Sequence, residues 1–315
     1  MIIDAKPKKT MNKELLWGID LGGTKIECAV LDKQNPSQVV VRERIDTESA
    51  KGYDHIIAQI KVLVDRVTGI IGEKPKAIGF ATPGVLNPLT NTMKNCNTVC
   101  LNGQALAADL ANTLGCEVKL ANDANCFALA ETLLGAVQDV NPNAEVAFGV
   151  IMGTGVGGGL VVHGKIINGL HGIGGEWGHN ILEDDGDACY CGKSGCVETV
   201  ISGPALEKYY EKHSGKKMKL KEILQAAKDH SDAAAEATVE RMVDYFGRAI
   251  STLINVIDPD VIVIGGGVGN VDLLYSEGYE RIKKYIFNSR EVHTPVVKPK
   301  LGDSAGVFGA AMLYS

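Results

Sequence analysis

The sequence predicts an α/β protein built from two related halves. A strand, a turn rich in glycine and threonine, and a returning strand occur near residues 15–31, and this pattern recurs near residues 146–163. Elsewhere, apolar side chains recur at helical spacing between short strand-like runs. The 315 residues are too many for one minimal core and suit two domains. We therefore expect two α/β halves that face a shared cleft.

The elements of the first half follow from local spacing. Three strands joined by short turns predict an antiparallel meander. After them come three stretches of helical pattern, two of which end at a glycine. The predicted elements are strands at 15–20, 26–31 and 39–45, a helix around 56–67, a strand at 76–80, a helix at 104–114, a strand at 118–120 and a helix from 122 to about 134.

The second half repeats the opening hairpin and closes with a glycine-rich junction. A strand that runs into three glycines predicts the start of another helix, and the end of the chain is rich in alanine, which favours helix. The predicted elements are strands at 146–152 and 160–162, a strand at 261–264 leading into the glycines at 265–267, and a final helix after 303–306.

The composition is that of a globular protein. Hydrophobic residues make up 45% and charged residues 22%, and the net charge is −6. Nucleic-acid binding usually needs a basic face, and no apolar run is long enough to span a bilayer. Residues 1–6 lack the order of a secretory signal, so we expect a cytoplasmic protein with no nucleic-acid or membrane partner. The polar, Lys-rich residues 1–14 indicate a lead-in, in which Met11 is an alternative start.

The first glycine turn could bind phosphate. Gly22 and Gly23 would let backbone N–H groups close on a phosphate, Thr24 adds a hydroxyl and Lys25 a positive charge. Asp20, at the end of the preceding strand, could orient Mg²⁺ through water. A plain hairpin turn explains the same residues, because Gly-Gly is common in such turns. The turn fits neither a Walker A loop nor a dinucleotide-binding fingerprint.

The second turn is richer in glycine, and its likeness to the first strengthens both interpretations. A strand with several glycines lets a ligand approach the backbone closely. Two such turns on opposite walls of a cleft could hold one triphosphate. The glycines at 265–267 would suit the nucleoside. The candidate nucleotide-binding residues of this half are Gly153, Thr154, Gly155, Gly157, Gly266 and Gly267.

A cluster of metal ligands follows the second hairpin. His179, Cys189, Cys191 and Cys196 offer one imidazole and three thiolates, the closed tetrahedral set of structural Zn²⁺. The alternative is a group of free thiols beside an unrelated histidine. Clustered cysteines in a chain without a secretory signal favour metal, and the other five cysteines are expected to be small buried hydrophobic residues. With no open coordination position, the ion would shape the site and not activate water.

Two carboxylates flank the metal ligands, and a third begins a helix. Glu176 and Glu198 would be brought together by a folded metal loop and could bind sugar hydroxyls, although exposed glutamates usually contact only water. Asn122 and Asp123 lie where a strand ends and a helix begins. They could simply cap the helix, or Asp123 could be the base that accepts the proton of an attacking hydroxyl.

Together these motifs resemble the ROK family of repressors, open reading frames and kinases, from Trp17 to Tyr314. Each motif alone is of moderate specificity, but their order is highly specific. The stretches 189–199 and 258–267 look most like bacterial fructokinase or mannokinase members. The motifs are Asp20–Lys25, Asn122–Asn125, Gly153–Gly155, Gly175–Asn180 and Cys189–Glu198.

The resemblance implies an actin-like, ribonuclease-H-like fold with the active site between two α/β domains. One would hold residues 1–121 with the C-terminal helix 303–315, and the other residues 122–302 with a zinc loop at 179–198. ATP, Mg²⁺ and structural Zn²⁺ would be the cofactors, and a hexose phosphorylated on its 6-hydroxyl the substrate. Asp123 matches the family's catalytic base. The residues that match its sugar ligands are Asn122, Asp123, Glu176, His179 and Glu198.

Three classes of function compete: a sugar kinase, a sugar-sensing regulator and a zinc-ribbon interaction module. A kinase for fructose, mannose or glucose fits all the motifs, and an N-acetylhexosamine kinase shares most of them. A sugar-sensing regulator would lack Asp123 or a phosphate turn, and only about sixteen residues precede the first strand, too few for a helix-turn-helix domain. A zinc-ribbon interaction module would leave the glycine turns unexplained. We therefore expect a kinase and, as its assembly, a homodimer.

Overall fold

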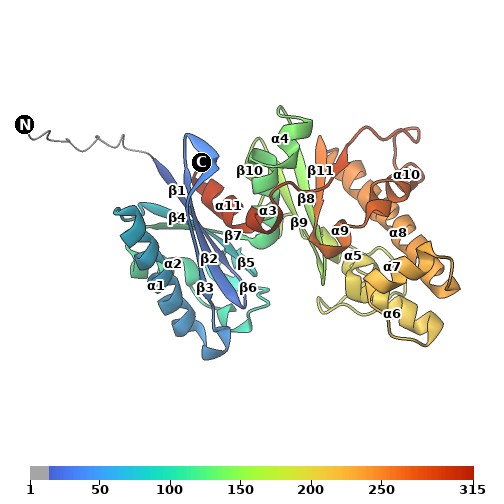
Figure 1. Cartoon of the computed structure of the whole chain (residues 1–315), viewed down its shortest axis with the longest axis horizontal. Helices are drawn as coiled ribbons and strands as arrows, with labels where there is room; N and C mark the ends of the chain where they lie inside the picture. Colours follow the sequence, from blue (N-terminus) through green and yellow to red (C-terminus); the bar gives the residue numbers. More distant parts are fainter. Residues whose placement is uncertain (1–13) are drawn as a thin grey trace, which may run out of the picture. The chain divides into compact units, whose positions relative to one another are not determined.

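The computed structural model describes residues 14–315 and contains two compact units (Figure 1). The expected lead-in and the alternative start at Met11 lie outside the described residues. Unit 1 comprises residues 14–86, 90–121 and 310–315, and unit 2 comprises residues 87–89 and 122–309. Each unit is built around its own five-stranded sheet.

The sheet of unit 1 begins with the antiparallel meander that the sequence predicts. β1 pairs antiparallel with β2, and β2 with β3, whereas β4 joins the other side of β1 in parallel. The order across the sheet is β3-β2-β1-β4-β7. The strands are β1 (Leu15–Leu21), β2 (Lys25–Asp32), β3 (Asn35–Asp46), β4 (Ala77–Thr82) and β7 (Glu117–Asn122).

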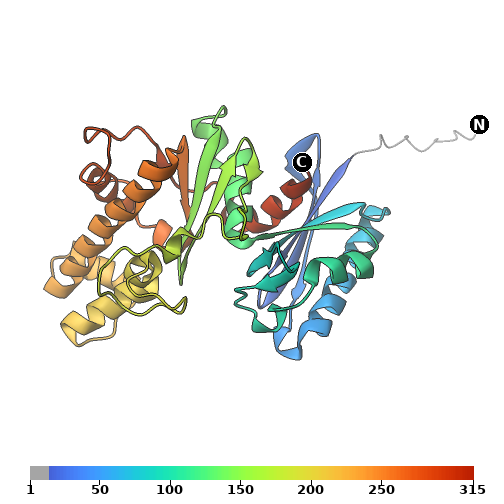
Figure 2. The ribbon, with the colours of Figure 1, turned by 180° about the vertical axis from the view of Figure 1, so that it is seen from behind.

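Two helices cover one face of this sheet, as the front and back views show (Figures 1 and 2). They are α1 (Tyr53–Ile71) and α2 (Leu106–Leu114), and both end at a glycine in the left-handed conformation, Gly72 and Gly115. The buried side chains of α1 recur every three or four residues, which explains the predicted helix. A small hairpin of β5 (Val85–Asn87) and β6 (Thr92–Lys94) was not predicted.

The sheet of unit 2 repeats the first sheet. Its order is β10-β9-β8-β11-β12, so that in both sheets the strands, counted as they occur in the chain, lie third, second, first, fourth, fifth. β8 pairs antiparallel with β9 and parallel with β11. The repeat predicted from the two hairpins is thus confirmed. The strands are β8 (Val146–Met152), β9 (Val156–Val162), β10 (Lys165–Ile166), β11 (Val261–Gly265) and β12 (Val296–Val297).

Glycines in this sheet let a helix lie very close to it. Helix α3 (Asp123–Leu133) packs on β8 and β9. A Cβ atom at Gly149 would lie 2.6 Å from the Cβ of Ala128, and one at Gly159 would lie 2.8 Å from the Ala124 carbonyl oxygen. Interior atoms do not approach so closely, so both positions require glycine. At Gly159 the group that approaches the strand is therefore the helix backbone, and not a ligand.

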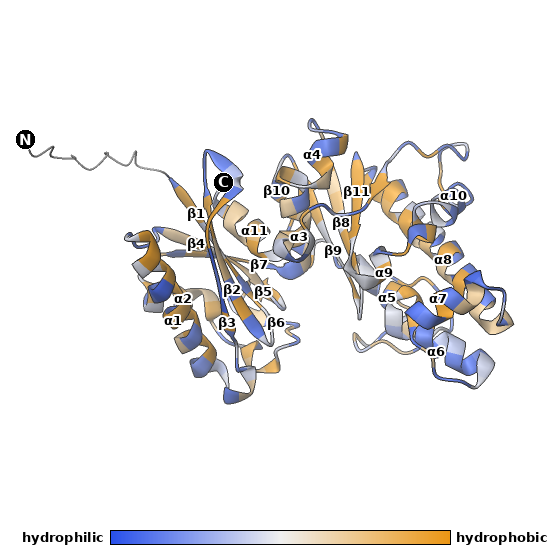
Figure 3. Cartoon of the chain, in the orientation of Figure 1, coloured by the Kyte–Doolittle hydropathy of each residue, from blue (hydrophilic) through white to orange (hydrophobic). Residues whose placement is uncertain are grey.

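The helices between β10 and β11 were not predicted. The longest, α8, is capped by Asp232, whose carboxylate accepts the N–H groups of Ala234 and Ala235 at 2.8 and 3.3 Å. Figure 3 shows apolar residues concentrated in β8 and β11 and mainly hydrophilic residues on α6. The helices are α5 (Val197–Ile201), α6 (Gly203–Ser214), α7 (Leu220–Lys228) and α8 (Ala233–Ile257).

Short helices complete the two units. The predicted C-terminal helix is α11, whose residues through Gly309 group with unit 2, while Ala310 and the following residues group with unit 1. Across residues 14–315, no helix combines the length and the apolar character needed to cross a membrane. The remaining short helices are α4 (Ala136–Val140), α9 (Gly266–Gly269), α10 (Glu277–Ile282) and α11 (Ala305–Ala311).

Candidate functional site

The start of α3 carries the two residues predicted to meet the substrate. Asn122 is the N-cap, and its Oδ1 accepts the N–H of Asn125 at 2.7 Å. Its Nδ2 also reaches Oε1 of Glu176 at 3.4 Å, so the capping residue links α3 to one of the predicted sugar-binding carboxylates. Capping and a place in the site are therefore compatible roles for Asn122.

Asp123 follows as the first residue of α3, with an exposed side chain. Its Oδ1 accepts the N–H of Ala124 at 2.8 Å, which fixes the orientation of the carboxylate. Desolvation by the surrounding protein raises the pKa of this carboxyl above its usual value, against the lowering effect of the backbone N–H groups. Access of water to the side chain moderates this shift. An oriented carboxylate with a raised pKa suits proton abstraction from a hydroxyl group.

Glu198 connects the metal loop to the second glycine turn. It lies in the first turn of α5, and its Oε2 accepts the N–H of Val156 at 3.0 Å. A Cβ at Gly155 would lie only 2.5 Å from the same oxygen. The sequence placed Gly155 with the nucleotide and Glu198 with the sugar, but it did not show that the two residues are in contact. The missing side chain of Gly155 makes room for this carboxylate.

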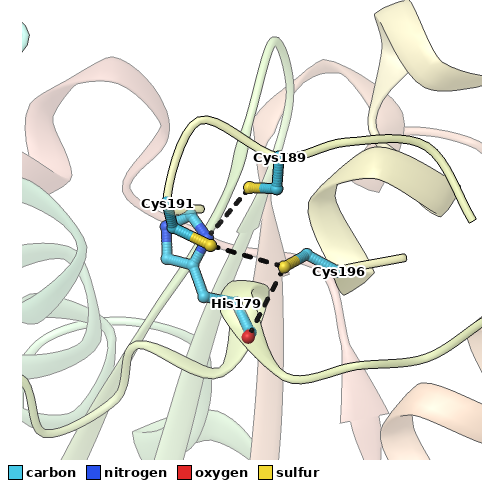
Figure 4. Close-up of side chains that lie close together, drawn as sticks. All are labelled: His179, Cys189, Cys191 and Cys196. Atoms are coloured by element: carbon cyan, nitrogen blue, oxygen red, sulfur yellow. Dashed lines mark hydrogen bonds between the residues drawn. The ribbon is translucent and has the colours of Figure 1, made fainter. Parts of the chain in front are cut away.

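The four predicted metal ligands lie together. One ligand atom from each of His179, Cys189, Cys191 and Cys196 lies within 4.8 Å of all the others, and Figure 4 shows the side chains pointing toward one another. Nδ1 of His179 lies 3.5 Å from Sγ of Cys189, and Sγ of Cys191 lies 3.6 Å from Sγ of Cys196. Three sulfurs and one imidazole nitrogen converging in this way suit a tetrahedral Zn²⁺ ion.

The thiols of this cluster differ in their acidity. The backbone N–H of Lys193 holds the pKa of Cys191 below its usual value, whereas burial raises the pKa of Cys196 to about 12. A cation among these sulfurs would favour the thiolate form of both. Of the five cysteines elsewhere, Cys28, Cys96 and Cys126 are buried as expected, and the other two are partly exposed.

Tyr190 contacts the predicted site residue His179, although no motif in the sequence singled it out. Its hydroxyl lies 3.0 Å from Nε2 of His179, and the two rings meet edge to face with centroids 5.1 Å apart. Desolvation, and then the negative charges of Glu198 and Glu176, raise the pKa of Tyr190 to about 12, so the phenol is neutral at neutral pH. The signal that could have found it is its position between two cysteine ligands.

The glycine turn of unit 2 lies beside two helix starts. The N–H of Gly203, at the start of α6, donates to the carbonyl of Gly153 at 2.9 Å. A Cβ at Gly153 would lie 3.8 Å from the nitrogen of Gly267, so the second glycine cluster adjoins the turn. Gly266 has a positive φ of 84°, and Gly157 packs near Ala124 of α3. Thr154 is exposed at the tip of the turn.

The glycine turn of unit 1 is held by hydroxyl groups. Oγ1 of Thr47 donates to the Gly22 carbonyl and Oγ of Ser49 to the Gly23 carbonyl, both at 2.7 Å. The N–H of Thr47 donates to the Thr24 carbonyl at 2.8 Å, and Gly22 N–H to the Lys25 carbonyl at 3.0 Å. These hydrogen bonds fix the backbone conformation of the turn. Asp20 lies at the end of β1, before the turn.

Comparison with known proteins now identifies the family. Residues 16–315 match the ROK family. This chain is a member of the ROK family. An N-acetyl-D-glucosamine kinase of Vibrio atlanticus (strain LGP32) is 37% identical over 309 residues, covering 95% of this chain and 99% of the relative. The N-acetyl-D-glucosamine kinase of Vibrio cholerae serotype O1 is 36% identical over the same shares.

A solved structure agrees with this assignment. The ROK hexokinase from Thermus thermophilus superposes with a TM-score of 0.84 at 31% identity, covering 95% of this chain and 97% of that one. The predictions of a ROK sugar kinase, of a phosphotransferase with an alcohol acceptor and of an actin-like fold are confirmed.

Proposed function

We propose that this protein transfers the γ-phosphoryl group of Mg·ATP to the 6-hydroxyl of N-acetyl-D-glucosamine. The observation that carries the proposal is a set of contacts in unit 2: Asn122, which precedes Asp123, reaches Glu176, and the Tyr190 hydroxyl contacts His179 and is affected by the charges of Glu198 and Glu176. The choice of sugar rests on the Vibrio relatives, which are named N-acetyl-D-glucosamine kinases and align with nearly the whole chain. The motifs favoured fructose or mannose as the substrate, and the assay described below tests these two sugars as well.

In the proposed reaction Asp123 acts as the base. The sugar hydroxyl oxygen attacks the γ-phosphorus, the bond to the bridging oxygen of ADP breaks, and the proton of the hydroxyl passes to the Asp123 carboxylate. Most of the catalysis is positioning. If Glu176, Glu198 and His179 bind the ring hydroxyls, the opposite end of the sugar meets Asp123. The flexible exocyclic 6-hydroxyl is the group best able to reach it.

The two glycine turns are the proposed contacts of the nucleotide. Backbone N–H groups of such turns suit phosphate oxygens, and we assign Thr24, Lys25 and Thr154 as side-chain donors. Asp20 is proposed to orient Mg²⁺, which supplies charge neutralisation at the phosphates when bound. Gly266 and Gly267 are proposed for the nucleoside. His179 and the three cysteines are proposed to hold one structural Zn²⁺ ion, which would keep Glu198 and His179 in place.

A coupled assay tests the function. N-acetyl-D-glucosamine, glucose, mannose, fructose and N-acetylmannosamine are each incubated with Mg·ATP, and ADP formation is followed. We expect the highest kcat/KM with N-acetyl-D-glucosamine, and phosphorus–proton NMR should place the phosphate on the 6-oxygen. Phosphate on the anomeric oxygen would contradict the proposed geometry. Sugar binding without turnover would indicate a sensor, and sedimentation of the same protein tests the predicted homodimer.

A further inference from the structure

We propose that Tyr190 is a side-chain gate of the sugar subsite. In the free protein its hydroxyl is hydrogen-bonded to Nε2 of His179, the ring nitrogen that does not face Cys189, and sugar binding displaces this hydroxyl. The inference rests on the proposed role of His179 as a sugar ligand and adds to it a residue that competes with the substrate. It makes Tyr190 a determinant of sugar affinity and not of catalysis.

The first argument is that Nε2 of His179 can form a hydrogen bond with only one partner at a time. Nδ1 lies 3.5 Å from Sγ of Cys189, on the side of the proposed metal ligands. With Nδ1 bound to the proposed cation, the ring proton lies on Nε2, which is then a donor. That N–H meets the hydroxyl of Tyr190 at 3.0 Å. A sugar hydroxyl can accept the same proton only after Tyr190 has left it.

The second argument is that the Tyr190 side chain can move while its backbone stays in place. The residue is 79% exposed, so rotation about its side-chain bonds breaks little packing. Its backbone lies in a tight turn, because Cys189 N–H donates to the Lys193 carbonyl at 2.7 Å and Gly192 N–H to the Cys189 carbonyl at 3.0 Å. The neighbours of Tyr190 on both sides belong to the metal cluster. Opening therefore needs a rotamer change and no movement of the loop.

The third argument is where the hydroxyl lies. Besides the imidazole, the carboxylates of Glu198 and Glu176 are close enough to act on the phenol of Tyr190. These three groups are the proposed sugar ligands. A neutral hydroxyl among them takes the place that a sugar hydroxyl would take, so the side chain acts as an internal stand-in for the substrate. Its removal should expose a site that is already formed.

The experiment measures sugar binding by calorimetry in the absence of nucleotide, for wild type, Tyr190→Phe and Tyr279→Phe. We expect Tyr190→Phe to bind the sugar about three- to tenfold more tightly, the worth of one competing hydrogen bond. Its zinc content should equal that of wild type, because Tyr190 is not one of the proposed metal ligands. Tyr279→Phe is the control, because it removes a hydroxyl that donates to the Val292 and Thr294 carbonyls instead.

The sign of the change decides the question. Weaker binding by Tyr190→Phe, with unchanged zinc content and melting temperature, would show that Tyr190 holds the sugar, and equal binding would show that it does not compete. Either result overturns the gate. The proposed function is judged separately by wild-type turnover: a hexose that binds without being phosphorylated contradicts the kinase but still tests the gate. If wild type binds no hexose in the panel, both proposals fail.

Discussion

The two glycine turns occupy equivalent places in the repeated sheets, but different parts of the chain support them. In unit 1 the turn at residues 22–25 is held by Thr47 and Ser49, which follow the third strand of the same meander. In unit 2 the turn at residues 153–155 is held by the start of α6 and lies against Glu198, two residues after the proposed metal ligand Cys196.

From this difference we expect changes at the two turns to have different effects. The hydrogen bonds that hold the first turn come from residues directly after its own meander, so we expect a change there to affect the nucleotide and not the sugar. The second turn shares its support with Glu198, and Glu198 lies in the helix that follows Cys196. We therefore expect substitutions near the second turn to change both the sugar affinity and kcat. Matched substitutions near the first turn should leave the sugar affinity unchanged.

The largest test of this division is Asp123→Asn. Loss of a general base costs about two to four orders of magnitude in kcat, whereas the amide keeps the shape needed for sugar binding. Asp109→Asn is the control in unit 1, because Asp109 also lies in the first turn of a helix, α2. We expect it to retain kcat. Near-normal turnover of Asp123→Asn in coupled assays would show that Asp123 is not the catalytic base.

The pH dependence of the wild-type enzyme follows from the same residue. Only the deprotonated carboxylate can accept a proton, so kcat should fall as pH falls through the pKa of Asp123. Because desolvation raises this pKa, the acid limb should lie above the usual range of an aspartate. A pH–rate profile checks this, and Asp123→Asn should lack that limb.

The next largest effect is expected from the metal loop. Cys191→Ser should lower the zinc content and raise the KM of the sugar about tenfold to a hundredfold, because even indirect changes at metal sites have effects of this size. The KM of ATP should change much less. Cys116→Ser, a partly exposed cysteine of unit 1, is the control. Zinc-free protein that binds sugar normally would show that the cluster has no part in the sugar site.

A matched pair of alanine substitutions compares the two turns directly. Gly155→Ala places a Cβ 2.5 Å from the Glu198 carboxylate, so this side chain must move and the KM of the sugar should rise about tenfold, the worth of a charged hydrogen bond. Gly23→Ala places a Cβ 3.4 Å from Oγ1 of Thr98, an ordinary contact. We expect its effect to be confined to the KM of ATP. Equal effects of both variants on the sugar would refute the division.

The parts of the site that local sequence determines could be predicted. The hairpins follow from alternation and glycine turns. The grouping of His179 with the three cysteines follows from four candidate metal ligands that lie close together in the chain. The apolar spacing of α8 is equally local, and Asp232 marks its start. No chemical motif lies on this helix, and it was not among the predicted elements.

Tertiary contacts could not be predicted in this way. A glycine in a strand signals a close approach but not the approaching group, which for Gly159 is a helix and for Gly155 is a carboxylate. The contact of Tyr190 with His179 likewise depends on how the loop returns after eleven residues. Such pairings arise from folding of the whole unit, and one sequence read alone does not specify them.

The smallest expected effect tests the support of the first turn. Thr47→Val keeps the shape of a buried side chain but removes the hydroxyl that donates to the Gly22 carbonyl. One lost hydrogen bond should lower the free energy of unfolding by about 1 kcal/mol and raise the KM of ATP a few fold, with the KM of the sugar unchanged. Ser49→Ala is the control, because its bond to the Gly23 carbonyl is exposed and water can replace it. Denaturant unfolding and steady-state kinetics measure both variants. If Thr47→Val raised the KM of the sugar as much as that of ATP, the first turn would not be independent of the sugar side.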